Sequence, residues 1–279
     1  MRLKLTILKT IQRYKMSAIQ TSKSSHVIGK MLNKVPEVTL AFWVIKIMST
    51  TVGETVADFL AVNIGWGQGI TGLVMGVLLT IALFWQFRTR RYTPWIYWLT
   101  VVLVSVVGTQ ITDLLTDGLG ISLYISTTAF AIFLSAIFVI WYRAEHSLSI
   151  HEIFTRRREG FYWAAILCTF ALGTAAGDLA TEALGLGFTN GVIAFGILIA
   201  LAYIAFRAGV NAVLTFWIAY ILTRPFGAAM GDLLTQSPSY GGLGIGAMWT
   251  SVIFLTIIVF LAGAAQLNMS KKQSQRIKR

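Results

Sequence analysis

The chain has 279 residues, of which 56% are hydrophobic and only 12% are charged, and its mean hydropathy is +0.71. Because an ordinary soluble domain has about 25% charged residues, this composition excludes a soluble globular fold. The net charge of +12 would suit a nucleic-acid-binding protein if it covered a soluble surface. Here all the basic residues except Lys46 and Arg224 lie at the chain ends or in alternate connections between apolar segments. We therefore expect a lipid bilayer, and no nucleic acid, as the partner.

Eight apolar segments recur between Val38 and Ala265, each about 20 residues long, which is enough to cross the hydrocarbon core of a bilayer. The sequence therefore predicts an all-α integral membrane protein with eight transmembrane helices and no soluble domain. The predicted spans are 38–60, 68–87, 95–117, 121–142, 161–184, 188–207, 210–235 and 242–265. The single cysteine, Cys168, lies within a predicted span and excludes an intrachain disulfide.

The basic residues also predict the topology. They precede the first span and follow the second, fourth, sixth and eighth, whereas the other four connections contain none. By the positive-inside rule, both termini and every even-numbered connection are expected to be cytoplasmic, in a multi-pass protein of the cell inner membrane. Residues 1–33 contain no acidic residue and are interpreted as a basic cytoplasmic tail without a cleaved signal peptide. A short basic helix lying on anionic lipid is the alternative for this segment.

Internal repetition is the strongest pattern in the sequence. Four segments align without a gap, and each has an aromatic residue followed by Trp, a Gly ten residues after the Trp, and an Asp five residues after the Gly. The four sets are Trp43, Gly53, Asp58; Trp98, Gly108, Asp113; Trp163, Gly173, Asp178; and Trp217, Gly227, Asp232. Two spans per repeat return the chain to the same side, so we predict four parallel repeats around a pseudo-axis along the membrane normal. The predicted repeats are 34–94, 95–160, 161–209 and 210–266, and a basic cytoplasmic tail follows at 267–279.

The repeat places acidic residues inside the membrane. The motif Trp is expected at the cytoplasmic interface, and the Asp lies roughly 22 Å deeper along the helix, so the four Asp carboxylates should share one level. Steps of four residues along the same helices add further acids to the same faces. A charge facing lipid costs at least about 2.5–3.5 kcal/mol, so we expect the odd-numbered spans to surround a central polar space. The predicted ion- or substrate-binding residues are Glu54, Asp58, Asp113, Asp117, Asp178, Glu182 and Asp232, with the four motif Asp residues as metal ligands.

Lys46 and Arg224 are the only basic residues within the predicted spans and are interpreted as internal counter-charges. Arg224 must pair with carboxylates or reach water, and Glu54 is the predicted partner. The motif glycines have two interpretations. They permit close helix packing, or they mark kinks, as Pro225 just before Gly227 suggests.

The residues Lys34–Thr39, Phe42, Trp43 and Lys46 and the run Thr50–Asp58 resemble a family of bacterial integral membrane proteins known by a repeat of unknown function. The resemblance continues through all four repeats, from Lys34 to Ala265. It implies the membrane-embedded repeat fold, and members are often labelled membrane-anchored. It assigns no catalytic or binding residue.

Three functions are open at this stage. Intramembrane carboxylates favour a transporter or channel for small cations, because hard divalent ions take oxygen ligands and buried carboxylates exchange protons. The alternatives are a non-transporting scaffold or regulatory protein and, third, an intramembrane enzyme. We expect no enzymatic activity and no cofactor, because His26, His146 and His151 all lie outside the spans, so no histidine-based metal or nucleophile cluster is available there. The sequence makes no prediction of the oligomeric state.

Overall fold

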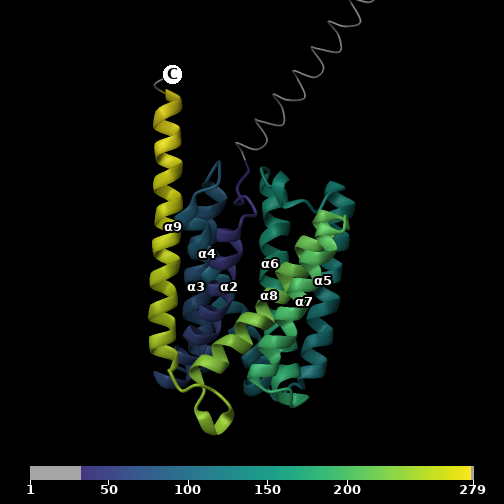
Figure 1. The fold of residues 1–279 in the computed structure, drawn as a ribbon, viewed down its shortest axis with the longest axis vertical. Helices are drawn as coiled ribbons and strands as arrows, with labels where there is room; N and C mark the ends of the chain where they lie inside the picture. The colour runs from purple at the N-terminus through teal and green to yellow at the C-terminus, as the bar shows by residue number, and fades with distance from the viewer. Residues whose placement is uncertain (1–32, 278–279) are drawn as a thin grey trace, which may run out of the picture.

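The computed structural model describes residues 33–277, which form a bundle of long helices running in alternating directions (Figure 1). The helices are α2 (Leu40–Asp58), α3 (Gly67–Arg88), α4 (Pro94–Asp113), α5 (Leu123–Glu145), α6 (Arg156–Asp178), α7 (Phe188–Arg207), α8 (Ala212–Thr235) and α9 (Ala247–Ile277). The described part of the chain contains eight helices long and apolar enough to span a membrane, which confirms the predicted number. The end at the top of Figure 1, where the basic connections lie, is called the basic end. The opposite end is called the acidic end.

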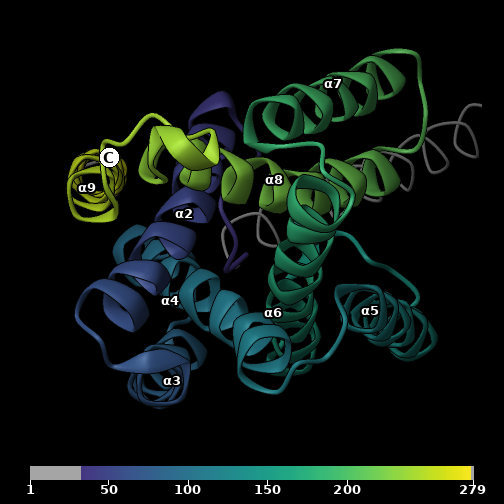
Figure 2. The same ribbon diagram turned by 90° about the horizontal axis from the view of Figure 1, so that it is seen from below.

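Four helices form the centre of the bundle. The inner helices α2, α4, α6 and α8 form a closed ring in which each contacts the next and α8 returns to α2 (Figure 2). The outer helices α3, α5, α7 and α9 surround this ring. In the most apolar stretch of each inner span, 56% to 67% of the residues are buried, against 11% to 28% in the outer spans. The prediction that the odd-numbered spans lie inside and the even-numbered spans outside is therefore confirmed.

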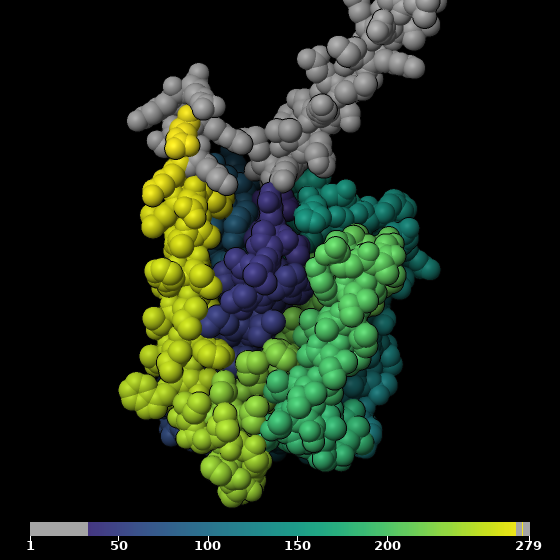
Figure 3. Space-filling model, viewed as in Figure 1, coloured from purple at the N-terminus to yellow at the C-terminus, as the bar shows by residue number. Residues whose placement is uncertain are grey.

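The outer helices pack in a cyclic order. Each of α3, α5 and α7 packs mainly on the inner helix that begins the following repeat, and α9 packs on α2, the first inner helix. Figure 3 shows α2 on one face of the bundle, directly beside α9. The packing unit is consequently an outer helix with the inner helix of the next repeat, and α9 completes the packing of α2.

The motif glycines lie where neighbouring inner helices cross. A Cβ atom added at any of them would come within less than 3.0 Å of a residue eight positions before the motif Asp of the next repeat. The four contacts are Gly53 with Ser105, Gly108 with Phe170, Gly173 with Arg224, and Gly227 with Thr50. The inner helices stay continuous at these positions, and α8 continues through Pro225. Close packing is therefore the role that the structure supports for these glycines.

The inner helices are irregular just after the motif Asp, not at the motif Gly. Single π-helical turns follow three of the four motif residues, at Phe59–Asn63, Leu114–Gly118 and Leu179–Ala183. In the fourth repeat the helix ends at Thr235 without such a turn, and the chain continues into a short 3₁₀ turn at Pro238–Tyr240. Because a π turn has hydrogen bonds from residue i to residue i+5, side chains beyond it no longer follow the four-residue step of the preceding helix.

A circle of aromatic side chains from the four inner helices, here called the aromatic ring, closes the bundle at the basic end. The aromatic residue at the start of one repeat contacts the Trp of the next repeat, with ring centroids 5.6–6.4 Å apart. The four pairs are Phe42 with Trp98, Tyr97 with Trp163, Tyr162 with Trp217, and Phe216 with Trp43. The motif Trp residues lie near the basic end, as predicted for their level along the helices, but Trp98, Trp163 and Trp217 are only 2–4% exposed and so face protein rather than an aromatic belt at the surface. Their indole rings pack between neighbouring helices where the inner helices begin, and that of Trp217 also contacts Phe138 and Trp141 of α5.

The glycine crossings predict a specific loss of stability. In Gly108→Ala the new methyl group would meet the Cβ of Phe170 at 2.6 Å and the backbone nitrogen of Ala171 at 3.2 Å. Overpacking of this kind typically costs about 1–3 kcal/mol, so the thermal unfolding midpoint of the purified protein should fall. Gly76→Ala is the matched control, because a Cβ there meets nothing within 4 Å. Equal midpoints for the two variants would show that the crossings are not tightly packed.

Candidate functional site

Arg224 connects the four inner helices at one level. Its side chain projects from α8 and is 0% exposed. The guanidinium donates from Nη1 to the Thr50 carbonyl at 2.7 Å and forms a 2.7 Å ion pair with Glu54, both on α2. It also donates to the hydroxyl of Thr109 on α4 and, at 2.7 Å from Nη2, to the hydroxyl of Thr174 on α6. One cation thus bonds to all three of the other inner helices, and the predicted pairing with Glu54 is confirmed.

The repeat pattern explains why an arginine fits this position. Arg224 lies eight residues before the motif Asp, whereas Glu54, Thr109 and Thr174 lie only four residues before theirs. An extended arginine side chain reaches about one helical turn, so its guanidinium meets these three side chains. The fourth repeat has the small, buried Ala228 at the corresponding position. Each of the first three repeats thus supplies one oxygen-bearing side chain at this level. The fourth repeat supplies the guanidinium of Arg224, which reaches this level from the side of the basic end.

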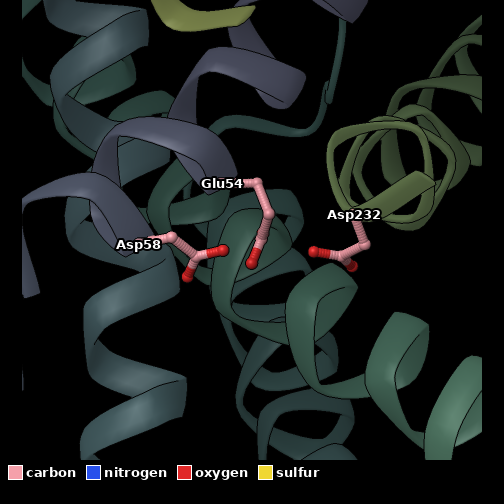
Figure 4. A group of neighbouring side chains, drawn as sticks. All are labelled: Glu54, Asp58 and Asp232. Atoms are coloured by element: carbon pink, nitrogen blue, oxygen red, sulfur yellow. The ribbon is translucent and has the colours of Figure 1, made fainter. Parts of the chain in front are cut away.

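Three carboxylates meet beside this level. Glu54 and Asp58 of α2 and Asp232 of α8 each offer an oxygen within 4.8 Å of the others, and the three side chains point toward one another (Figure 4). Glu54 and Asp232 are buried, with exposed fractions of 6% and 7%, and Asp58 is half-buried. Two oxygens that bind one Ca²⁺ ion at about 2.3–2.6 Å each can be at most about 5 Å apart. The separations in the group therefore allow all three carboxylates to bind a single cation.

The other predicted acids lie around this group. Asp113 on α4 and Asp178 on α6 are half-buried and lie within electrostatic range of Glu54, but they are not part of the three-carboxylate group. Asp117 and Glu182 lie in the π turns and are exposed. Exposure thus decreases along the acids from the acidic end toward Glu54. The structure brings together two of the four predicted metal ligands, with Glu54 as the third member.

Lys46 occupies a separate layer between Arg224 and the aromatic ring. Its Nζ lies 4.1 Å from the ring centroid of Phe170 on α6 and 4.4 Å from that of Tyr220 on α8. The side chain is 1% exposed, and its Nζ makes no hydrogen bond within the described part of the chain. Lys46, which was predicted to be a counter-charge, thus contacts two aromatic faces and has no carboxylate partner among the described residues. Phe170 was missed as a partner, although it stands where the other repeats have Thr, Ser or Arg.

Among the acids outside the spans, Glu152 has a clear electrostatic partner at the basic end. Arg158 donates to its carboxylate at 2.8 Å and to Glu145 at 2.9 Å. The hydrogen bond from the Arg158 guanidinium holds the pKa of the Glu152 carboxyl below its usual range. These contacts join the end of α5 to the start of α6, and they lie far along the chain from the motif acids.

The fold and the site together define a multi-pass membrane protein built from four two-helix repeats around a charged centre. The chain belongs to the family described as Repeat of Unknown Function (DUF347), whose model matches residues 41–92, 96–147, 161–209 and 215–268. Each match covers one inner helix and the outer helix that follows it, which confirms the resemblance and the four-repeat organisation. No curated protein and no solved structure matches the chain.

The contacts of Arg224 predict a double-mutant cycle. Arg224→Met leaves Glu54 buried without its cation, and removing one partner of a buried ion pair typically costs about 3–5 kcal/mol. The double variant Arg224→Met with Glu54→Gln removes the uncompensated charge, so it should recover part of that stability. Unfolding of the purified variants in denaturant measures both effects.

The control for this cycle is Arg143→Met, which removes an exposed arginine from α5 and should leave the stability nearly unchanged. A double variant no more stable than Arg224→Met alone would contradict the coupling between Glu54 and Arg224.

Proposed function

We propose that the protein is a transporter for small inorganic cations, divalent metal ions among them, with proton coupling. The observation that carries the proposal is the meeting of Glu54, Asp58 and Asp232 within 4.8 Å inside an apolar bundle. Three ionised carboxylates facing one guanidinium would leave two uncompensated negative charges. Such charges are costly in a membrane interior unless a cation or protons neutralise them. Carboxylate oxygens are the ligands that hard divalent cations prefer.

The arrangement of acids supports entry from the acidic end. Exposed Asp117 and Glu182 lie at that end, half-buried Asp58 follows, and the buried Glu54 lies innermost. A path lined by carboxylates lowers the energy of a cation that moves along it. In the opposite direction, Arg224, Lys46 and the aromatic ring lie between Glu54 and the basic end. This order supports a transporter that changes conformation rather than a continuously open channel.

Arg224 provides a physical route for coupling. A cation that binds Glu54 competes with the guanidinium for the same carboxylate. Since Arg224 also bonds to Thr50, Thr109 and Thr174 on three helices, a change at Glu54 alters the contacts that hold the ring together. If the helices can adopt two arrangements, a bound cation favours the arrangement in which Glu54 is free of Arg224. Binding of the cation is then coupled to movement of the helices. Carboxylates must be deprotonated to bind a metal ion, so binding releases any protons they hold, which supports proton coupling.

A purely structural role, as a scaffold or regulatory protein, is the alternative. The glycine crossings and the aromatic ring account for the packing of the inner helices, and neither uses a motif Asp. The convergence of Glu54, Asp58 and Asp232 therefore favours a binding function over packing alone.

The placement of basic residues supports an orientation. By the positive-inside rule we propose that the basic end and both termini face the cytoplasm and that the acidic end faces outward from the cell inner membrane. Cations would then reach the carboxylates from outside the cell.

The site predicts the effect of two substitutions on transport. Glu54→Gln and Asp58→Asn each remove a ligand charge, so cation uptake by purified protein in liposomes should fall by about 10- to 100-fold or more. The assay uses a panel of monovalent and divalent cations, with and without a pH gradient. Arg143→Met is the control, because it removes an exposed charge at the basic end. Full activity in both site variants would show that the site is wrong, even if the protein transports ions.

The orientation predicts a labelling pattern in a Cys168→Ser background. Gly118→Cys, in an exposed turn at the acidic end, should react with an impermeant thiol reagent added outside intact cells. Ser147→Cys, in the α5–α6 connection at the basic end, should react only after the membrane is permeabilised. The reverse pattern would overturn the proposed topology.

A further inference from the structure

A short segment before α2 lies at the basic end of the bundle, over the middle of the inner ring. Residues 33–36, here called the strap, precede the helix that begins at Leu40. Figures 1 and 2 together show this segment at the basic end and close to the centre of the ring. Lys34 and Val35 are only 5% and 4% exposed, although they lie outside any helix. The strap is therefore packed into the mouth of the bundle and is not a solvated tail.

A buried ion pair holds the strap. The Nζ of Lys34 lies 2.5 Å from the Glu159 carboxylate in the first turn of α6, and the two side chains are 6% and 1% exposed. The same ammonium donates to the carbonyl oxygen of Phe87, near the end of α3, at 3.2 Å. Gln86 donates to the other carboxylate oxygen of Glu159 at 3.2 Å. Carboxylate and carbonyl oxygens thus form a cation site that a lysine of the same chain fills.

Backbone bonds join the strap to two connections. The Lys34 amide donates to the Ile153 carbonyl at 2.9 Å, and the Tyr92 amide donates to the Asn33 carbonyl at 2.9 Å. The side chain of Asn33 accepts from the Ile153 amide at 3.1 Å. Ile153 lies in the connection that Arg158 anchors through Glu145 and Glu152. The strap is therefore fixed to the α3–α4 and α5–α6 connections at once.

The strap also crosses the ring along its diagonal. It leads directly into α2, whereas its ion-pair partner Glu159 belongs to α6. In the ring α2 contacts α4 and α8, and α6 contacts the same two helices, so α2 and α6 are at opposite corners. The aromatic ring, which includes Phe42 near the start of α2, lies just beyond the strap toward the centre. Any path along the axis to the basic end must therefore pass the strap.

We propose that the strap is the gate at the basic end and that the ion pair between Lys34 and Glu159 is its latch. This inference rests on the proposed transport function, since a gate requires a path. Lys34 acts as a tethered cation that occupies the Glu159 site, so a small cation leaving along the axis competes with it for the carboxylate. Opening separates Lys34 from Glu159 and breaks the backbone bonds to Tyr92 and Ile153.

The test uses a cysteine placed behind the gate. Lys46 lies beyond the aromatic ring and reaches from α2 to Phe170 on the opposite helix, so Lys46→Cys in a Cys168→Ser background reports access along the axis. An impermeant thiol reagent is added in proteoliposomes from the side on which Ser147→Cys reacts. With the latch intact, labelling should be slow. Lys34→Met and Glu159→Gln should each raise the rate roughly tenfold, the factor that corresponds to 1.4 kcal/mol of lost closing free energy.

Two further variants separate a latch from a general loss of structure. The charge swap Lys34→Glu with Glu159→Lys should restore slow labelling, because it rebuilds the ion pair. Arg143→Met removes an exposed cation from the same end and should leave labelling slow. Hydrogen exchange at the Tyr92 and Ile153 amides should rise with labelling in the latch variants only. Slow labelling in both latch variants, or rapid labelling with the latch intact, would overturn the gate.

Cation uptake is measured separately on the same proteoliposomes. If the latch variants label rapidly while no variant transports any cation in the panel, the strap controls access along the axis but the proposed transport function is wrong. If uptake depends on Glu54 and Asp58 while labelling is insensitive to the latch, the transport site stands and the gate is wrong.

Discussion

The centre of this molecule depends on one constraint, the need to surround a buried guanidinium with hydrogen-bond acceptors and a negative charge. A cation in a dry, apolar bundle is tolerated only when its N–H donors find partners and a negative charge lies close. Arg224 meets this requirement with oxygens from α2, α4 and α6, so the distances between four helices are fixed by one side chain. The absence of a Cβ at Gly173 leaves room for the stem of that side chain, which ties helix crossing to charge placement.

Charge is layered along the axis as a result. From the basic end the layers are the aromatic ring, Lys46 between two aromatic faces, Arg224, and the carboxylates near Glu54. The motif Asp is the same in all four repeats, but the repeats differ four and eight residues before it, so the four-fold pattern of the backbone is not matched by a four-fold pattern of charge at those levels. An arginine or a glutamate repeated there would have placed four more like charges at one level. The departures from symmetry let opposite charges neutralise one another within the bundle.

Sequence reasoning predicted the helices and their order but not the local details of the site. Long apolar segments and polar stripes identify spans and inner faces, and steps of four residues led from Arg224 to Glu54. The same steps fail beyond Asp113 and Asp178, because a π turn follows each and leaves the next acid exposed. The buried Trp residues were assigned to the interface because an indole ring suits both places, and only the convergence of the inner helices decides between them. That Phe170 faces Lys46 depends on the reach of the Lys46 side chain from α2 across the ring to α6, which the repeat alignment does not contain.

The cyclic packing of the outer helices has a consequence for biosynthesis. Transmembrane segments leave the ribosome in order, yet the principal outer partner of α2 is α9, the last of the eight described spans in chain order. During translation α2 therefore holds buried polar and charged residues on a helix whose final neighbour does not yet exist. Until α9 is translated, the side of α2 that it covers, which includes the Thr55 hydroxyl bonded to Ser251, must be shielded by lipid, water or the insertion machinery. Completion of the packing around α2 is thus tied to the synthesis of α9, and a chain released before α9 is translated would expose one side of α2.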